Sequence, residues 1–199
     1  MTKMVLELPD TIFPLSYPRK MDNEAFQAFC FANPELIVER EVDGTLTIMS
    51  PVSPNSGNRE GQIITDLFIY ARQFEGKAFS SSTGFLLPDS SVKSPDACYV
   101  SAAQLQKFTK EELDHFAPIV PEFIVEVVSP TDRLKDVEEK MRTAWIGNGV
   151  KLAWLIDVDS DRLWIYRADR SVELVTPLDR KIGGEDVLPG FTFDLKLLS

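Results

Sequence analysis

The chain has 199 residues and a formal net charge of −10, because 31 Asp and Glu outweigh 21 Lys and Arg. Hydrophobic residues make up 44% and charged residues 26%, which is ordinary for a folded globular domain and excludes a disordered chain. No stretch approaches the roughly 18 apolar residues of a membrane span, and residues 1–20 carry charges and prolines where a secretory signal needs an apolar run. We therefore expect a cytoplasmic protein with no membrane partner.

The numbers of cysteine and histidine residues, together with the acidic net charge, also exclude several kinds of catalytic and binding site. Cys30 and Cys98 are the two cysteines, which are too few for a disulfide framework or a cysteine metal site. The single histidine, His115, lies in a polar stretch, so neither a nucleophilic triad nor a histidine zinc site is expected. The acidic balance argues against strong unspecific binding to nucleic acid, although it leaves room for a local basic channel. These observations leave catalysis by carboxylates, by a lysine or with a hard metal ion.

The first predicted elements are a helix and a hairpin. Asp22 suits the N-cap of a helix that Pro34 ends. Strands are expected at residues 36–41 and 45–49, because they flank the Asp43-Gly44 dipeptide, a strong hairpin signal.

A second helix and two strands follow. Residues 50–57 predict a connector, and a helix that Glu60 opens ends near residue 75. The Pro-Asp-Ser-Ser turn at residues 88–91 separates expected strands at 77–87 and 92–100.

The second half of the chain predicts a parallel crossover. Residues 102–118 read as a charged insertion with a short helix, and the nearly continuous apolar run at 123–128 is typical of a central strand. A helix then runs to about residue 148, and a strand at 151–157 completes the strand–helix–strand order. A further strand is expected at 162–167 and a weaker one at 172–176, and the tail has no assignment. The order predicts an α/β or mixed α+β fold.

Glu126 stands in the middle of the apolar strand at 123–128. A sheet covered on both faces would take its carboxylate out of water, and a buried carboxylate ionises only when it is paired or bound to a metal. The structural alternative is that Glu126 pairs with a lysine or arginine of a neighbouring element.

Two further acids belong to the same hypothesis. Asp96 follows Pro95 within the expected strand at 92–100, although a Pro-Asp turn would also explain it. Glu60 falls on the buried face of the second helix, where the helix dipole alone also favours an acid in the first turn. Lys140 lies at the edge of the apolar stripe of the helix after Glu126, so it either extends to solvent or reaches back toward Glu126.

Two or three carboxylates beside a lysine suit a magnesium site for phosphodiester hydrolysis. Magnesium takes oxygen ligands and keeps several waters, and the ion activates the attacking water while a lysine offsets the charge that builds on the phosphoryl group. Glycoside hydrolysis also uses two carboxylates, but it needs no lysine and the sequence has no evident aromatic sugar platform.

These residues lie in segments that together form a specific pattern. The segments are Ser94-Pro95-Asp96-Ala97, residues 121–132, Glu139-Lys140-Met141, residues 149–157, Ser56-Gly57-Asn58-Arg59 and Leu188-Pro189-Gly190-Phe191. The pattern resembles the Uma-type restriction endonucleases, a family built on a domain of unknown function and placed in the PD-(D/E)XK nuclease superfamily. The resemblance covers nearly the whole chain from about residue 20.

The resemblance implies a restriction-endonuclease-like core, with a mixed sheet flanked by helices, over residues 21–199 after an N-terminal extension of residues 1–20. It implies that Asp96 and Glu126 are the two acids of the motif and that Glu60 is a helix-borne acid. The motif's lysine is expected two residues after the second acid, where this chain has Val128, so Lys140 would serve as a migrated lysine. The resemblance also implies a homodimer.

The leading hypothesis is a magnesium-dependent DNA endonuclease, with manganese as a possible substitute. Asp96, Glu126 and Glu60 would bind the metal, and Lys140 would stabilise the transition state. If one ion joins Asp96 and Glu126, their carboxylates should lie within about 4–6 Å of each other. The alternatives are a nuclease-like domain that binds or regulates without cutting, and a structural domain with paired acids. A positive rim for DNA is expected at Arg59, Lys93, Arg133 and Lys135.

Overall fold

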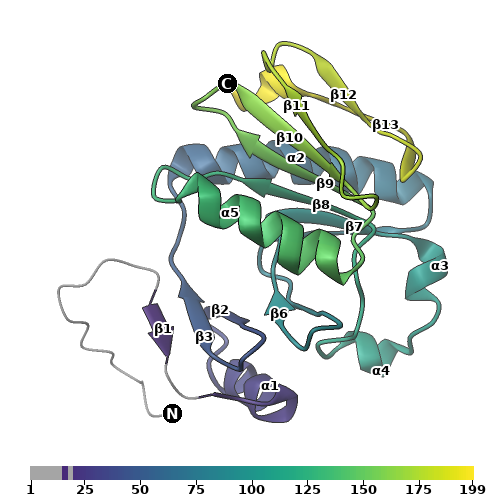
Figure 1. Ribbon diagram of the computed structural model, residues 1–199. Coiled ribbons are helices and arrows are strands. Elements are labelled where there is room, and N and C mark those ends of the chain that lie inside the picture. Colours follow the sequence, from purple (N-terminus) through teal and green to yellow (C-terminus); the bar gives the residue numbers. More distant parts are fainter. Residues whose placement is uncertain (1–14, 18–19) are drawn as a thin grey trace.

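The structure is a computed structural model that describes residues 15–17 and 20–199 (Figure 1). A central sheet has the strand order β11-β10-β9-β8-β7-β4. β8 and β9 run parallel, and their other neighbours are antiparallel, so this sheet is mixed. Its strands are β4 (Lys77–Ser80), β7 (Ala97–Val100), β8 (Phe123–Val127), β9 (Leu152–Asp157), β10 (Arg162–Arg167) and β11 (Val172–Val175).

Helices cover both faces of the central sheet (Figure 1). The long helix α2 (Pro54–Gln73) buries Ile63 and Leu67 in one core with alternate residues of β8. On the other face, α5 (Leu134–Lys140) continues into a π-helical turn (Met141–Trp145) and a 3-10 turn (Ile146–Asn148). Met141 and Trp145 pack there against Ile124. Because side chains alternate along a strand, Glu126 shares the α5 face with Ile124.

A smaller antiparallel sheet, with the order β1-β3-β2-β6-β5, lies beside the central one (Figure 1). Helix α1 (Asn23–Ala32) covers it and inserts Phe26 into a core with Leu46 and Val92. Gly44 closes the hairpin at a φ of +85°, in the left-handed region that glycine tolerates best. The strands are β1 (Leu15–Tyr17), β2 (Ile37–Arg40), β3 (Leu46–Met49), β5 (Phe85–Leu86) and β6 (Val92–Lys93).

The remaining elements are short. Helices α3 (Ala102–Leu105) and α4 (Lys110–Leu113) form the charged insertion between β7 and β8. The tail forms a hairpin of β12 (Lys181–Gly184) and β13 (Leu188–Asp194), then a 3-10 turn (Leu195–Leu198). Phe191 and Phe193 join the core beneath α2. Among the described residues, no helix combines the length and apolarity that a membrane crossing requires.

The predicted mixed α/β architecture is confirmed, including the first helix, the hairpin and the parallel crossover from β8 to β9. The expected N-terminal extension, residues 1–20, lies mostly outside the described residues, and its described part, β1, pairs with β3. The proposed domain boundary stays a prediction.

Two predicted strands are wrong as continuous elements. Residues 77–87 divide into β4 and β5, and residues 92–100 divide into β6 and β7, with the halves in different sheets. The second division falls at Pro95. Proline has no N–H to donate to a sheet ladder, so the strand is interrupted there. Asp96 therefore occupies a bend before β7 rather than the interior of a strand.

The second helix also begins earlier than expected. The hydroxyl of Ser53 accepts a hydrogen bond from the N–H of Ser56, and Pro54 occupies the first helical position. Glu60 thus lies in the second turn of α2. The helix dipole in the first turn no longer explains why an acid stands there.

Candidate active site

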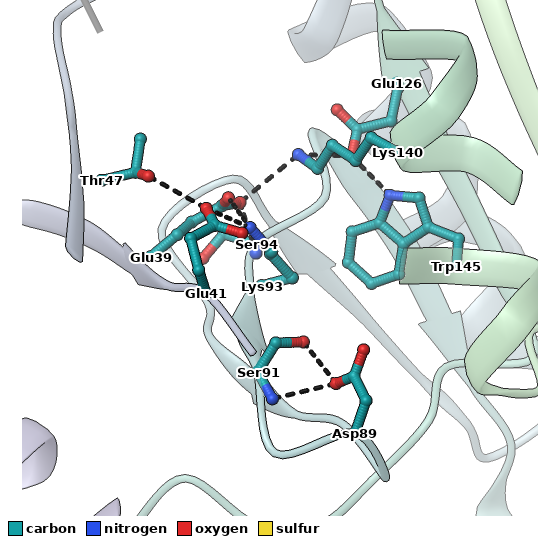
Figure 2. A network of polar contacts seen from close by, with 10 residues as sticks. All are labelled: Glu39, Glu41, Thr47, Asp89, Ser91, Lys93, Ser94, Glu126, Lys140 and Trp145. Carbon is teal, nitrogen blue, oxygen red and sulfur yellow. Dashed lines mark hydrogen bonds and ion pairs between the residues drawn. The ribbon is translucent and has the colours of Figure 1, made fainter. Parts of the chain in front are cut away.

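Glu126 lies on the central strand β8, in which every residue is buried. Its Oε1 accepts a hydrogen bond from the indole Nε1 of Trp145 at 2.7 Å and forms an ion pair with Lys140 Nζ at 2.9 Å (Figure 2). Burial raises the pKa of Glu126, and Lys140 opposes that shift. Among the described residues, none donates to Oε2, so one carboxylate oxygen remains free to bind something else.

Lys140 ends α5 and reaches back over the sheet toward Glu126. Its Nζ lies 2.9 Å from Glu126 Oε1 and 3.3 Å from Glu39 Oε1, and its side chain keeps 22% of its surface exposed. Burial favours the neutral amine, but the carboxylates of Glu126 and Glu39 outweigh it and raise the pKa of Lys140. Lys140 is therefore a fixed cation and no proton acceptor at neutral pH.

Asp96 lies next to Glu126 across the β7–β8 pairing. Ala97 pairs with Val125, so the antiparallel register carries Asp96 opposite Glu126. Asp96 Oδ2 accepts the backbone N–H of Val127 at 2.6 Å. Burial raises the pKa of Asp96 well above its usual value, and the carboxylates of Glu126 and Glu60 raise it further.

Glu60 approaches the same place from α2. Its side chain is half-buried, and burial raises the pKa of Glu60 against a hydrogen bond from Ser81. The carboxylate of Glu126 adds to this rise. The structure therefore brings all four predicted site residues to one end of the central sheet, each from a different element.

Hard oxygen ligands dominate this site. Asp96 and Glu126 could each give one free carboxylate oxygen to a divalent cation, with Glu60 nearby. Across residues 15–17 and 20–199, however, no three His, Cys, Asp or Glu side chains converge closely enough to hold a metal ion by themselves. A metal ion held by Asp96 and Glu126 would therefore need water or substrate oxygens to complete its coordination.

A family model described as "Putative restriction endonuclease", Uma2, matches residues 23–196. That match spans most of the chain. The chain belongs to the Uma2 family.

A solved structure shares the Uma2 fold seen here. It is described as the crystal structure of a putative nuclease belonging to DUF820 from Anabaena variabilis. The two are 18% identical, the match covers 89% of this chain and 97% of the other, and the TM-score is 0.70. No curated protein matches the chain.

The structure adds three side chains to the site of this Uma2 protein that the sequence did not indicate. Trp145 binds Glu126, Glu39 binds Lys140, and Lys93 binds Glu39 at 3.1 Å. An indole in a helical stripe, or a charged residue in a short strand, is usually structural. Only the tertiary structure, in which β2 pairs with β6 and Lys140 of α5 contacts Glu39 of β2, shows that these residues meet.

The positive rim expected for DNA is partly wrong. Lys93 is buried, with 7% of its side chain exposed, and both Glu39 and Glu41 accept its hydrogen bonds. Arg59 is tied to Asp159 at 2.9 Å and to the carbonyl of Leu198. Arg133 and Lys135, near the N-terminus of α5, are the exposed members.

Asp96→Asn is expected to stabilise the metal-free protein at neutral pH. When folding raises the pKa of a carboxyl group, the folded state favours the protonated form. The resulting stability is complete below the pKa of the group in the unfolded chain, and it is lost as the pH rises through the pKa of the group in the folded protein. Asparagine keeps the acceptor for Val127 and removes the charge, so the gain should be about 0.5–2 kcal/mol in the free energy of unfolding. Urea unfolding in EDTA should show this gain shrinking as pH falls. A wild type that is the more stable of the two at neutral pH would contradict the assignment.

Proposed function

We propose that this Uma2 protein is a metal-dependent endonuclease that hydrolyses phosphodiester bonds in DNA. One observation carries the proposal: two adjacent carboxylates, the buried Glu126 and the half-buried Asp96, lie at the end of an apolar sheet, with a fixed cation 2.9 Å from Glu126. Burying like charges side by side is costly in a structural core, whereas it is common where a ligand compensates the charge.

Magnesium, or manganese in its place, fits the donor set. Mg²⁺ binds through one or two carboxylates and keeps several waters, which agrees with a site where the described residues form no three-acid cluster. Asp96 and Glu126 would hold the ion through their free oxygens, and Glu60 would supply an auxiliary ligand or orient water. When bound, the ion polarises the phosphoryl group and lowers the pKa of the attacking water.

Lys140 supplies the positive charge of the proposed site. The PD-(D/E)XK motif has its lysine two residues after the second acid, where this chain has Val128. Here Lys140 reaches the same acid from the following helix. Its fixed ammonium group would stabilise the negative charge that develops on the phosphoryl oxygens. The proposal therefore includes membership of that superfamily, with Lys140 as a migrated lysine.

The alternative is a nuclease-like domain that binds nucleic acid without cutting it. Val128 and the net charge of −10 favour this alternative. Both hypotheses include a metal site, and they differ in turnover. The homodimer also belongs to the proposal, because two copies would place one site on each strand of a duplex.

The wild-type protein is expected to nick or cut plasmid DNA in the presence of Mg²⁺ or Mn²⁺ and to stop when EDTA is added. A labelled RNA of matched sequence, incubated in parallel, decides between the two nucleic acids. Metal binding without cleavage of either substrate would favour the binding domain. A chain that neither binds metal nor cleaves would have a purely structural set of acids.

A further inference from the structure

A row of charged side chains joins the small sheet to the candidate active site (Figure 2). It begins at Glu41, whose Oε1 lies 2.6 Å from Lys93 Nζ, and Lys93 in turn lies 3.1 Å from Glu39 Oε2. Glu39 Oε1 lies 3.3 Å from Lys140 Nζ, which reaches Glu126 at 2.9 Å. Acids and lysines alternate along this row, so every lysine has a carboxylate on each side.

Glu39 is the link between the two sheets. It stands on β2 with 5% of its side chain exposed, and it accepts the backbone N–H of Ser94 at 3.0 Å. Ser94 belongs to the crossing from β6 to β7 that also carries Asp96. Burial alone would raise the pKa of Glu39, but Lys140 and Lys93 lower it, so the carboxylate stays charged.

Lys140 thus contacts two carboxylates that have different proposed roles. Glu126 belongs to the pair of acids proposed to bind the metal, and a divalent cation on that carboxylate would compete with Lys140 for its charge. Glu39 lies outside that pair, on another sheet, and contacts Lys140 at 3.3 Å, independently of Glu126.

We infer that Glu39 is a positioning residue, which holds the ammonium group of Lys140 in the site when Glu126 is engaged by a metal. This inference rests on the proposed function. Lys93 assists by compensating the second oxygen of Glu39, and the Lys140 side chain keeps 22% of its surface exposed. The small sheet therefore contributes a residue to the active site and is more than an N-terminal appendage.

The test measures the mobility of Lys140 without metal and without substrate. Glu126→Gln removes the carboxylate that a metal would engage, so Lys140 must depend on Glu39. NMR relaxation of the lysine Cε–H bonds, in protein with isotope-labelled lysine, gives the order parameter of that side chain. The Lys140→Met variant assigns the signal.

The expected result is that Lys140 keeps its order parameter in Glu126→Gln and loses most of it in Glu126→Gln/Glu39→Gln. Glu126→Gln/Glu41→Gln is the matched control, since it makes the same chemical change on a carboxylate that is 40% exposed and contacts Lys93 instead. In Glu126→Gln/Glu39→Asp the carboxylate at position 39 is kept on a side chain that is one methylene shorter. An intermediate loss of the Lys140 order parameter is expected. Mobile Lys140 in Glu126→Gln alone, or ordered Lys140 in both Glu39 variants, would overturn the inference.

Cleavage gives a second measurement. Glu39→Gln should lower kcat by about 10- to 100-fold with little change in KM, because a small misplacement of a catalytic group has effects of this size. Glu41→Gln should leave kcat close to wild type. In the Lys140→Met background Glu39→Gln should have no further effect on kcat, and an additional loss there would contradict positioning. If the wild type cleaves nothing, the proposed function fails while the NMR result still decides the role of Glu39.

Discussion

Glu126→Gln is expected to abolish measurable DNA cleavage and to weaken metal binding by more than about 100-fold, since even residues behind a ligand are worth 10- to 100-fold in metal affinity. Glutamine has nearly the shape of glutamate, and its amide oxygen can still accept the hydrogen bond from Trp145. What it loses is the negative charge that would hold a divalent cation.

The fold should survive this substitution. Lys140 keeps Glu39 as a partner, so no buried lysine is left without a carboxylate. The matched control is Glu122→Gln, another buried acid of the same segment, which accepts hydrogen bonds from Ser101 and lies outside the site. That variant should cleave DNA as the wild type does, once any loss of stability is taken into account. Wild-type cleavage by Glu126→Gln would remove Glu126 from the mechanism.

Lys140→Met is expected to have two separable effects. It should lower kcat by about 10²- to 10³-fold, which is typical of removing one preorganised group that stabilises transition-state charge. It should also lower the free energy of unfolding by about 3–5 kcal/mol, because it leaves the carboxylates of Glu126 and Glu39 buried without their shared cation.

Kinetics and denaturant unfolding of the same samples distinguish these effects. Lys135→Met is the control, since Lys135 is an exposed residue of the same helix and its replacement should change neither quantity much. A variant that is destabilised but retains the wild-type kcat per folded molecule would show that Lys140 only neutralises buried acids. A loss of kcat with unchanged stability would mean that the ion pairs of Lys140 contribute nothing to folding.

The sequence predicted those parts of the site that depend on local pattern. Glu126 is conspicuous because it interrupts a continuous apolar run, and Lys140 because it borders a helical stripe that points at the same strand. Both signals lie within a strand–helix–strand unit, whose packing follows from its order in the chain. The hairpin around Gly44 is equally local.

The parts that escaped prediction depend on long-range packing. Glu39 and Lys93 meet because β2 pairs with β6, and no periodicity within either strand indicates that pairing. The division of residues 92–100 between two sheets is similar, because Pro95 signals an interruption without telling which sheet each half joins. The same division places Lys93 in a buried ion pair, away from the surface where a DNA rim was expected.

The central claim is that Asp96 and Glu126 are kept together, against their mutual repulsion, for a divalent cation. Calorimetric titration of Mg²⁺ and Mn²⁺ into the wild type, beside the same titration of Glu126→Gln, measures this binding itself. Saturable binding heat is expected for the wild type and none for the variant, with both proteins folded. Equal heats from the two proteins, or none from either, would contradict it.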